Sequence, residues 1–323
     1  MKKIIATVGP SLLHTTPLSE VHNERNIYRI NGAHGTVDDI EQYILKIQEQ
    51  IPDAKILMDL PGNKVRTAGF KDVHIDIEEN KIFTLSFHQM NYTNFYSHLK
   101  EGDTIWANDS IFRFTVQSID IKNEKIHLLS HSTGRLLNNK GMHVRGIHEH
   151  IPFLFEKDKG LIKLANKYNL AYVGLSFVRT QADVIEAKSL ITSDSIIISK
   201  VETVAAVKNL VDILNEVEYI LIDRGDLSTE IGLEKVPAYQ QYIIDKAVFH
   251  GKKVFLATQF LKSMEHNPIP TIPEVIDMYN TLKSGIYGIQ MSEETAVGKY
   301  PKNCLDTIIK LIDEITDEKL HNC

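Results

Sequence analysis

The sequence predicts a (β/α)8 barrel with a small antiparallel β domain inserted after the third barrel strand. Eight short apolar runs recur along the 323 residues, and amphipathic helical patterns separate most of them. Eight strands that alternate with helices favour a closed barrel over a doubly wound sheet. Between the third and fourth runs, short alternating segments with turn signals such as Glu101-Gly102-Asp103 indicate a separate antiparallel domain.

The barrel elements are expected in a regular order. Strands are predicted at residues 4–8, 27–30, 56–58, 172–175, 196–198, 219–222, 254–257 and 287–291. Helices are predicted at residues 38–50, 183–191, 204–214, 237–250 and 273–284, with a closing helix at 301–315. Pro237 and Pro273 suit the first turn of a helix, where the missing N–H has no partner to lose.

The inserted domain accounts for the long gap between the third and fourth barrel strands. Its strands are predicted at residues 73–77, 81–87, 104–107, 112–119 and 125–130. We therefore expect a barrel domain of residues 1–67 and 143–323 and an inserted, lid-like β domain of residues 68–142. An insertion after a barrel strand lies at the face where barrel active sites form, so it can close over them.

Composition excludes several classes of partner. Lys and Arg number 36 against 42 Asp and Glu, a net charge of -6, so no basic surface for nucleic acid or an anionic membrane is expected. No stretch reaches the roughly 18 apolar residues of a membrane span. The two cysteines, Cys304 and Cys323, form no disulfide framework, which favours a reducing, cytoplasmic location.

Polar residues follow the predicted strands, at the face where barrel active sites lie. They are Thr7, Arg29, Asn31, Asp59, Ser176, Arg179, Lys200, Glu202, Asp223, Arg224, Asp226, Thr258, Gln259, Ser292, Glu293, Glu294 and Thr295. Lys200 and Glu202 follow the buried run 196–198 and are two residues apart, so their side chains point the same way. A surface ion pair is the alternative interpretation of these two charges.

The carboxylates of Glu202 and Asp226 stand at the ends of adjacent strands and are the kind of ligand that Mg²⁺ prefers. Lys200 beside them, and Arg29 across the barrel, can neutralise a phosphoryl group. Gly225-Asp226 opens a helical turn whose free N–H groups can hold a small carboxylate. The pattern predicts a divalent metal, a phosphoryl group and a small organic anion, although Asp226 can instead cap the helix.

Seven segments, in the family's order, resemble motifs of the pyruvate kinase family. Ala6-Thr7-Val8-Gly9-Pro10-Ser11 resembles T-[IV]-G-P-[AS]-S, Arg29-Ile30-Asn31-Gly32-Ala33-His34-Gly35 resembles R-[LI]-N-[FLM]-S-H-G, and Asp59 through Arg66-Thr67 resembles D-T-K-G-P-E-I-R-T. Ser199-Lys200-Val201-Glu202 is similar to S-K-[IV]-E, and Arg224-Gly225-Asp226-Leu227 to A-R-G-D-L-G. Residues 257–264 resemble A-T-Q-M-L-E-S-M, and residues 292–301 resemble S-G-E-T-A-x-G-x-Y-P. Together these motifs span nearly the whole chain.

The resemblance implies Mg²⁺-dependent phosphoryl transfer, a reaction of glycolysis, between phosphoenolpyruvate and ADP, giving pyruvate and ATP. Lys200, Arg29 and Thr258 would be catalytic, with Thr258 near the enolate carbon, and Glu202 and Asp226 would bind Mg²⁺ or Mn²⁺. The substrate-binding set implied by the resemblance is Gly225, Asp226, Thr258, Phe177 and Ser292. The nucleotide-binding set is Asn31, His34, Arg66, Lys140 and Asp109.

The sequence departs from the family where a monovalent cation is held. Ala33 and Leu60 replace a Ser and a Thr ligand, and Lys64 replaces the Glu of G-P-E-I-R. Lys64 can supply the charge of K⁺, so we expect activity without K⁺. Further replacements are Ser228, Glu293, Ile272, His143 and Arg145. The family's C-terminal regulatory domain is expected to be missing, which permits a homodimer in place of the usual tetramer.

Two other functions remain open. The same site can serve another enzyme of phosphoenolpyruvate or a 2-oxo acid, through enolisation, decarboxylation or release of phosphate, because a fold does not fix a function. A non-catalytic metabolite sensor is the third interpretation. The presence of both Lys200 and Thr258 argues against a sensor, which needs neither a phosphoryl stabiliser nor a proton route.

Overall fold

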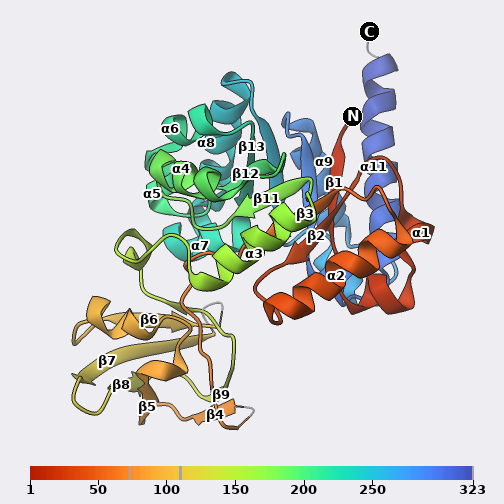
Figure 1. Cartoon of the computed structure of the whole chain (residues 1–323). Coiled ribbons are helices and arrows are strands. Elements are labelled where there is room, and N and C mark those ends of the chain that lie inside the picture. Colours follow the sequence, from red (N-terminus) through yellow and green to blue (C-terminus); the bar gives the residue numbers. More distant parts are fainter. Residues whose placement is uncertain (73, 109–110, 322–323) are drawn as a thin grey trace. The chain divides into compact units, whose positions relative to one another are not determined.

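The computed structural model describes residues 1–72, 74–108 and 111–321 and divides the chain into two compact units (Figure 1). The first unit is Met1–Gly62 with Leu154–Cys323, and the second is Asn63–Phe153. The boundaries expected from the sequence, 67/68 and 142/143, lie inside the second unit. Backbone pairing explains this, because Arg66 bridges to Gly141 and the Thr67 N–H donates to the Lys140 carbonyl.

The first unit is a closed barrel of eight parallel strands, as predicted. The strands are β1 (Lys3–Thr7), β2 (Asn26–Asn31), β3 (Ile56–Asp59), β11 (Tyr172–Leu175), β12 (Ile196–Lys200), β13 (Tyr219–Asp223), β14 (Lys253–Ala257) and β15 (Gly288–Met291). Their order around the barrel is β1-β15-β14-β13-β12-β11-β3-β2, so β1 closes the ring between β2 and β15. All eight predicted strands are therefore confirmed.

Helices surround the barrel (Figure 1). The longer helices are α2 (Val37–Gln50), α3 (Glu156–Lys167), α4 (Gln181–Leu190), α6 (Leu210–Glu216), α7 (Arg224–Ile231), α8 (Val236–Phe249), α9 (Ile272–Lys283) and α11 (Pro301–His321). The shorter helices are α1 (Leu18–Val21), α5 (Val204–Lys208) and α10 (Glu293–Ala296). The helix predicted at 204–214 is broken into α5 and α6 at Asn209. Among the helices that the structure describes, none combines the length and apolar character needed to cross a bilayer.

The barrel interior is filled by apolar side chains from several neighbouring strands. Ile5, Leu57, Ile198, Leu221 and Phe255 belong to one buried cluster inside the ring. This explains why the strands are almost entirely apolar, because both of their faces are covered. The polar residues therefore collect where the strands end.

The second unit contains the antiparallel sheet predicted for the insertion. Its strands are β4 (His74–Ile77), β5 (Ile82–Ser86), β6 (Thr104–Ala107), β7 (Phe112–Asp120), β8 (Lys125–Ser130), β9 (Gly134–Leu137) and β10 (Met142–His143). Five of them pair in the order β10-β6-β7-β8-β5, and β4 pairs with β9. The sequence did not reveal β9 or β10. The start predicted for the first strand, Val73, lies outside the described residues.

Candidate active site

Lys200 lies at the centre of a buried group of charged side chains at the ends of the barrel strands. Its Nζ atom is 3.3 Å from Glu202 Oε2, 3.7 Å from Asp223 Oδ2 and 3.9 Å from Asp59 Oδ2. It also donates a hydrogen bond of 3.0 Å to Ser176 Oγ. Glu202 and Lys200 are 0% and 5% exposed, so the surface ion pair considered from the sequence is wrong.

The charges of this group explain the protonation of Lys200. Burial alone lowers the pKa of a lysine, but Asp59, Glu202, Asp223 and Asp226 outweigh it and hold the pKa of Lys200 above its usual value. Burial raises the pKa of Glu202; Lys200 opposes this shift, whereas Asp226 and Asp223 add to it. Lys200 therefore keeps its proton and its positive charge. This charge alone does not neutralise the carboxylates around it.

Arg29 extends the group across the barrel. Its Nε and Nη2 atoms each lie 2.7 Å from Asp59 Oδ2, and its Nη1 donates to Thr7 Oγ1 at 2.8 Å. Asp59 Oδ1 is buried and has no hydrogen-bond partner. Two cations, Arg29 and Lys200, thus face the four carboxylates named above. When all four carboxylates are ionised, their excess of two negative charges matches one divalent cation.

The residues present fit a divalent metal. Glu202, Asp223 and Asp226 each offer a carboxylate oxygen, and these oxygens lie within 4.8 Å of one another. Glu202 Oε1 accepts a hydrogen bond from the Phe177 N–H at 2.7 Å, whereas its buried Oε2 accepts none. Carboxylate oxygens are the ligands of Mg²⁺ and Mn²⁺. The structure therefore brings together the predicted metal ligands, Glu202 and Asp226, and adds Asp223.

Asp223 is the functional candidate that the sequence motifs did not single out. It occupies the position of the Ala in A-R-G-D-L-G, and this departure was the available signal. Its Oδ1 accepts from the N–H groups of Gly225 at 3.1 Å and Asp226 at 3.4 Å, so Asp223 caps α7. The alternative in which Asp226 caps this helix is wrong, because Asp226 lies inside the first turn.

Thr258 lies beside the same amides. Its Oγ1 accepts from the Gly225 N–H at 2.9 Å and donates to the Ala257 carbonyl at 2.6 Å. The Arg224 guanidinium donates to the Thr258 carbonyl through Nε at 3.0 Å and through Nη2 at 2.6 Å. Arg224 also pairs with Asp277 at 2.9 Å. These contacts hold the Thr258 hydroxyl against the opening of α7.

Backbone strain is concentrated at this face of the barrel. Phe177 follows β11 with a φ of 56°, and Thr258 follows β14 with a φ of 71°. Gln259 and Leu261 also have positive φ angles, 57° and 49°. Such conformations are costly for residues with side chains and persist where surrounding contacts enforce them, often at functional sites. At Phe177 those contacts include the hydrogen bond that its N–H donates to Glu202 Oε1.

Ser292, the remaining predicted substrate-binding residue, begins the turn into α10. Its N–H donates to Glu294 Oε2 at 2.8 Å. Glu293, which replaces a family Gly, is exposed and lies 3.8 Å from Lys262 Nζ. Lys262 itself replaces the Glu of A-T-Q-M-L-E-S-M. The added negative charge of Glu293 is thus matched by an added positive charge.

The residues predicted to face the nucleotide are divided between the two units. In the barrel, Asn31 Oδ1 accepts from the Ala33 N–H at 3.1 Å, and His34 is exposed. In the second unit, Arg66 Nη1 donates to the Asn139 carbonyl at 3.4 Å. Lys140, also predicted to face the nucleotide, lies in the second unit, as does Lys64, the predicted replacement for K⁺. Asp109 lies outside the described residues.

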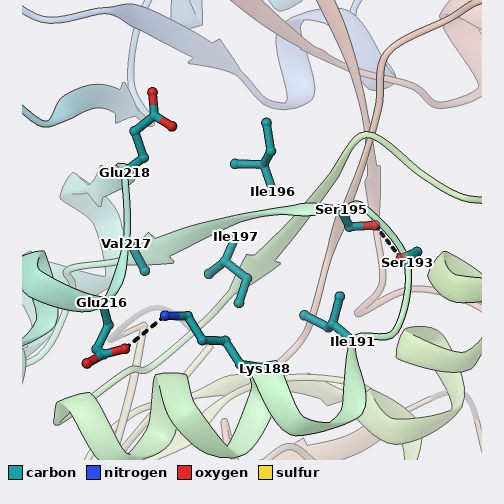
Figure 2. Close-up of a pocket in the computed structure, with 9 residues that line it drawn as sticks. All are labelled: Lys188, Ile191, Ser193, Ser195, Ile196, Ile197, Glu216, Val217 and Glu218. Carbon is teal, nitrogen blue, oxygen red and sulfur yellow. Dashed lines mark hydrogen bonds and ion pairs between the residues drawn. The ribbon is translucent and has the colours of Figure 1, made fainter.

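A separate cavity of about 200 Å³ lies where strands β12 and β13 begin, opposite to the end that carries Lys200 (Figure 2). Lys188 pairs with Glu216 at 2.8 Å, and the hydroxyls of Ser193 and Ser195 form a hydrogen bond of 2.8 Å. Figure 2 marks both contacts with dashed lines. Active sites of barrels lie at the other ends of the strands. We therefore assign this cavity no role in the chemistry.

Comparisons with known proteins agree with the geometry. The family model described as "Pyruvate kinase, barrel domain" matches residues 1–305. A pyruvate kinase of Thermotoga maritima is 32% identical over 97% of this chain and 70% of its own length. The pyruvate kinases of Sporosarcina psychrophila and Geobacillus stearothermophilus are each 30% identical, and the chain spans only 56% and 55% of their lengths.

Proposed function

The chain belongs to the pyruvate kinase family, and on that premise we propose that it catalyses metal-dependent phosphoryl transfer between phosphoenolpyruvate and ADP, giving pyruvate and ATP. The observation that carries the proposal is the burial of Lys200 among four carboxylates at the barrel mouth. A fixed ammonium beside carboxylates that lack positive charge is the arrangement that phosphoryl transfer requires.

Each residue then has a distinct task. Glu202 and Asp226 would hold Mg²⁺ or Mn²⁺, which supplies charge neutralisation for the phosphoryl group. Lys200 stabilises the phosphoryl group as it leaves the enol oxygen and bonds to the terminal phosphate of ADP. Arg29 contacts the same group, and the hydroxyl of Thr258 lies near the carbon that takes up a proton to form pyruvate.

We also propose that the reaction needs no K⁺. Leu60 is 1% exposed and apolar where the family has a Thr ligand, and Ala33 offers no side-chain oxygen. Lys64 supplies a permanent positive charge in the same motif. Equal rates of ATP formation in K⁺-free and K⁺-rich buffers are expected. A requirement for K⁺ would refute this part of the proposal.

A second candidate is another reaction of phosphoenolpyruvate or a 2-oxo acid on the same residues. The observation that favours it is Asp223, whose carboxylate already bonds the amides expected to hold the substrate. Altered binding at this point permits a product other than ATP. The residues that stabilise the phosphoryl group are common to both candidates.

One experiment separates these functions. The protein is incubated with phosphoenolpyruvate, Mg²⁺ and ADP, and ³¹P spectra are recorded over time. Growth of the ATP signals supports kinase activity. Free phosphate or a new phosphorylated product without ATP supports the second candidate. No turnover, with phosphoenolpyruvate only raising the melting temperature, indicates a sensor.

A further inference from the structure

The amides expected to hold the substrate carboxylate are already bonded to a carboxylate of the protein. Asp223 Oδ1 accepts from the N–H groups of Gly225 and Asp226, at 3.1 Å and 3.4 Å. The Gly225 N–H is shared with Thr258 Oγ1, at 2.9 Å. Both of these amides therefore have an acceptor before a ligand arrives.

The other oxygen of Asp223 faces the charged group. Oδ2 lies 3.7 Å from Lys200 Nζ, and the Asp223 side chain belongs to the oxygen cluster with Glu202 and Asp226. A 2-oxo acid bound for phosphoryl transfer needs the same two things from the protein, amide donors for one carboxylate oxygen and cationic charge for the other. Asp223, which is 7% exposed, makes contacts of both kinds.

We propose that Asp223 is a specificity residue that occupies the substrate-carboxylate site at the Gly225 and Asp226 amides, so that a small carboxylate must displace it to bind. This inference rests on the function proposed above, since it assigns the same amides to the substrate. Its basis is one side chain, because the family motif has Ala at this position and an Ala side chain carries no oxygen to compete for the amides.

The inference predicts that removing the side chain tightens carboxylate binding. In Asp223→Ala the two amides are open, and the negative charge that repels a second carboxylate is gone. We expect the affinity for pyruvate to rise on the order of tenfold. A change of this size corresponds to removing the hydrogen bonds of the Asp223 cap together with the repulsion between the two carboxylates. Asp223→Asn keeps a capping oxygen on the amides while removing the charge, so its gain should be clearly smaller.

The test is calorimetric titration of pyruvate into the full-length protein saturated with Mg²⁺. A gain in Asp223→Ala that exceeds the gain in Asp223→Asn supports the proposal. An unchanged or weaker affinity in Asp223→Ala overturns it, and so does an equal gain in both variants, since charge alone then explains the effect. Thr36→Ala, which removes the exposed N-cap side chain of α2 that accepts from the Asp39 N–H, is the control for loss of a cap and should bind pyruvate as the wild type does.

Two further measurements keep the outcomes distinct. If Asp223→Ala does not fold, Asp223→Gly replaces it, because glycine at an N-cap costs little and also leaves the amides open. ATP formation is recorded for each variant in parallel. Absence of ATP together with the predicted order of pyruvate affinities would contradict the proposed function but not this inference. ATP formation with affinities that Asp223 does not influence would contradict the inference alone.

Discussion

At the scale of single residues, the site is a balance between burial and charge. Lys200 is buried among four carboxylates whose negative charge, when all are ionised, exceeds the positive charge of Lys200 and Arg29. Burying charges without compensation is costly, and the buried Glu202 Oε2 lacks a hydrogen bond. The group is therefore arranged to gain free energy when a divalent cation binds.

Added Mg²⁺ should stabilise the wild-type protein against heat. At about one hundred times its Kd, a ligand that binds only the folded state raises the free energy of unfolding by about 3 kcal/mol. Glu202→Gln should lose most of this rise, because the fully buried ligand loses its charge. Melting temperatures with and without Mg²⁺ check the prediction. Glu216→Gln, which changes a pair with Lys188, serves as the control and should respond to Mg²⁺ as the wild type does.

Glu294 should make stability depend on pH. Burial raises its pKa to about 7, while its own backbone N–H and that of Ser292 oppose the shift. The folded state therefore keeps a proton that the unfolded state loses from about pH 4.5 upward. The contribution is fully present below pH 4.5 and falls as pH rises through 7, by about 3 kcal/mol.

Glu294→Gln should remove this contribution. Relative to the wild type, the free energy of unfolding of the variant should rise between pH 4.5 and pH 7.5, as measured by chemical denaturation. A difference between the two proteins that is constant over this range would contradict the assignment. The exposed neighbour Glu293 gives a matched control, because Glu293→Gln should follow the wild-type profile closely.

Individual residues also show how much of the site could be predicted from the sequence. The positions of Lys200, Glu202 and Asp226 at adjacent strand ends were predicted from strand order and motif, and their proximity was confirmed. Asp223 was not singled out, because its role depends on which backbone N–H groups lie within hydrogen-bond distance of its carboxylate, and the sequence does not show this. The pairing of Lys262 with Glu293 likewise joins two motifs that are distant in the sequence. The chemical roles of the site residues stay predictions.

At the scale of elements, the buried Asp158 of α3 holds the loop after β3 in place through hydrogen bonds to backbone N–H groups. Its Oδ1 accepts from the Gly62 N–H at 2.9 Å, and its Oδ2 accepts from the Phe155 N–H at 2.8 Å. Asp158 is 0% exposed, so water does not replace these bonds. The loop follows Asp59, the partner of Arg29, and its position therefore bears on the site.

Asp158→Ala should destabilise the protein by about 3 kcal/mol, because two buried N–H groups lose this acceptor. Denaturant unfolding monitored by circular dichroism measures the change. Glu156→Ala, an exposed carboxylate on the same turn, should leave the midpoint unchanged. A similar midpoint for Asp158→Ala and Glu156→Ala would show that the hydrogen bonds of Asp158 do not contribute to the free energy of unfolding.

The elements that the sequence missed share a physical cause. The barrel strands were predictable because they are apolar runs covered on both faces. Strands β9 and β10 are short, and β10 has only two residues, so they carry no alternating pattern long enough to detect. Helix α3 was not predicted, because it is strongly polar and directly follows the insertion, although the Asp158 side chain accepts from the N–H of its N-cap residue, Phe155.

At the scale of the whole molecule, the order of strands around the closed barrel gathers the polar ends of distant segments. Residues 29 and 59 come from neighbouring strands β2 and β3, whereas residues 200 and 223 come from β12 and β13. The match to the family over residues 1–305 agrees with this arrangement. The fold class was predictable from the repeating pattern alone, whereas the state of the amides at α7 required the structure.

The most direct test of the central claim is the rate of ATP formation by Lys200→Met relative to the wild type. Phosphoenolpyruvate, ADP and Mg²⁺ are supplied in K⁺-free buffer, and ATP is followed by its ³¹P signals. We expect ATP from the wild type, a loss of at least about a hundredfold in Lys200→Met, and largely retained metal binding. Lys188→Met, a change in an ion pair at the other end of the barrel, should retain the wild-type rate. ATP formation by Lys200→Met at the wild-type rate would contradict the account.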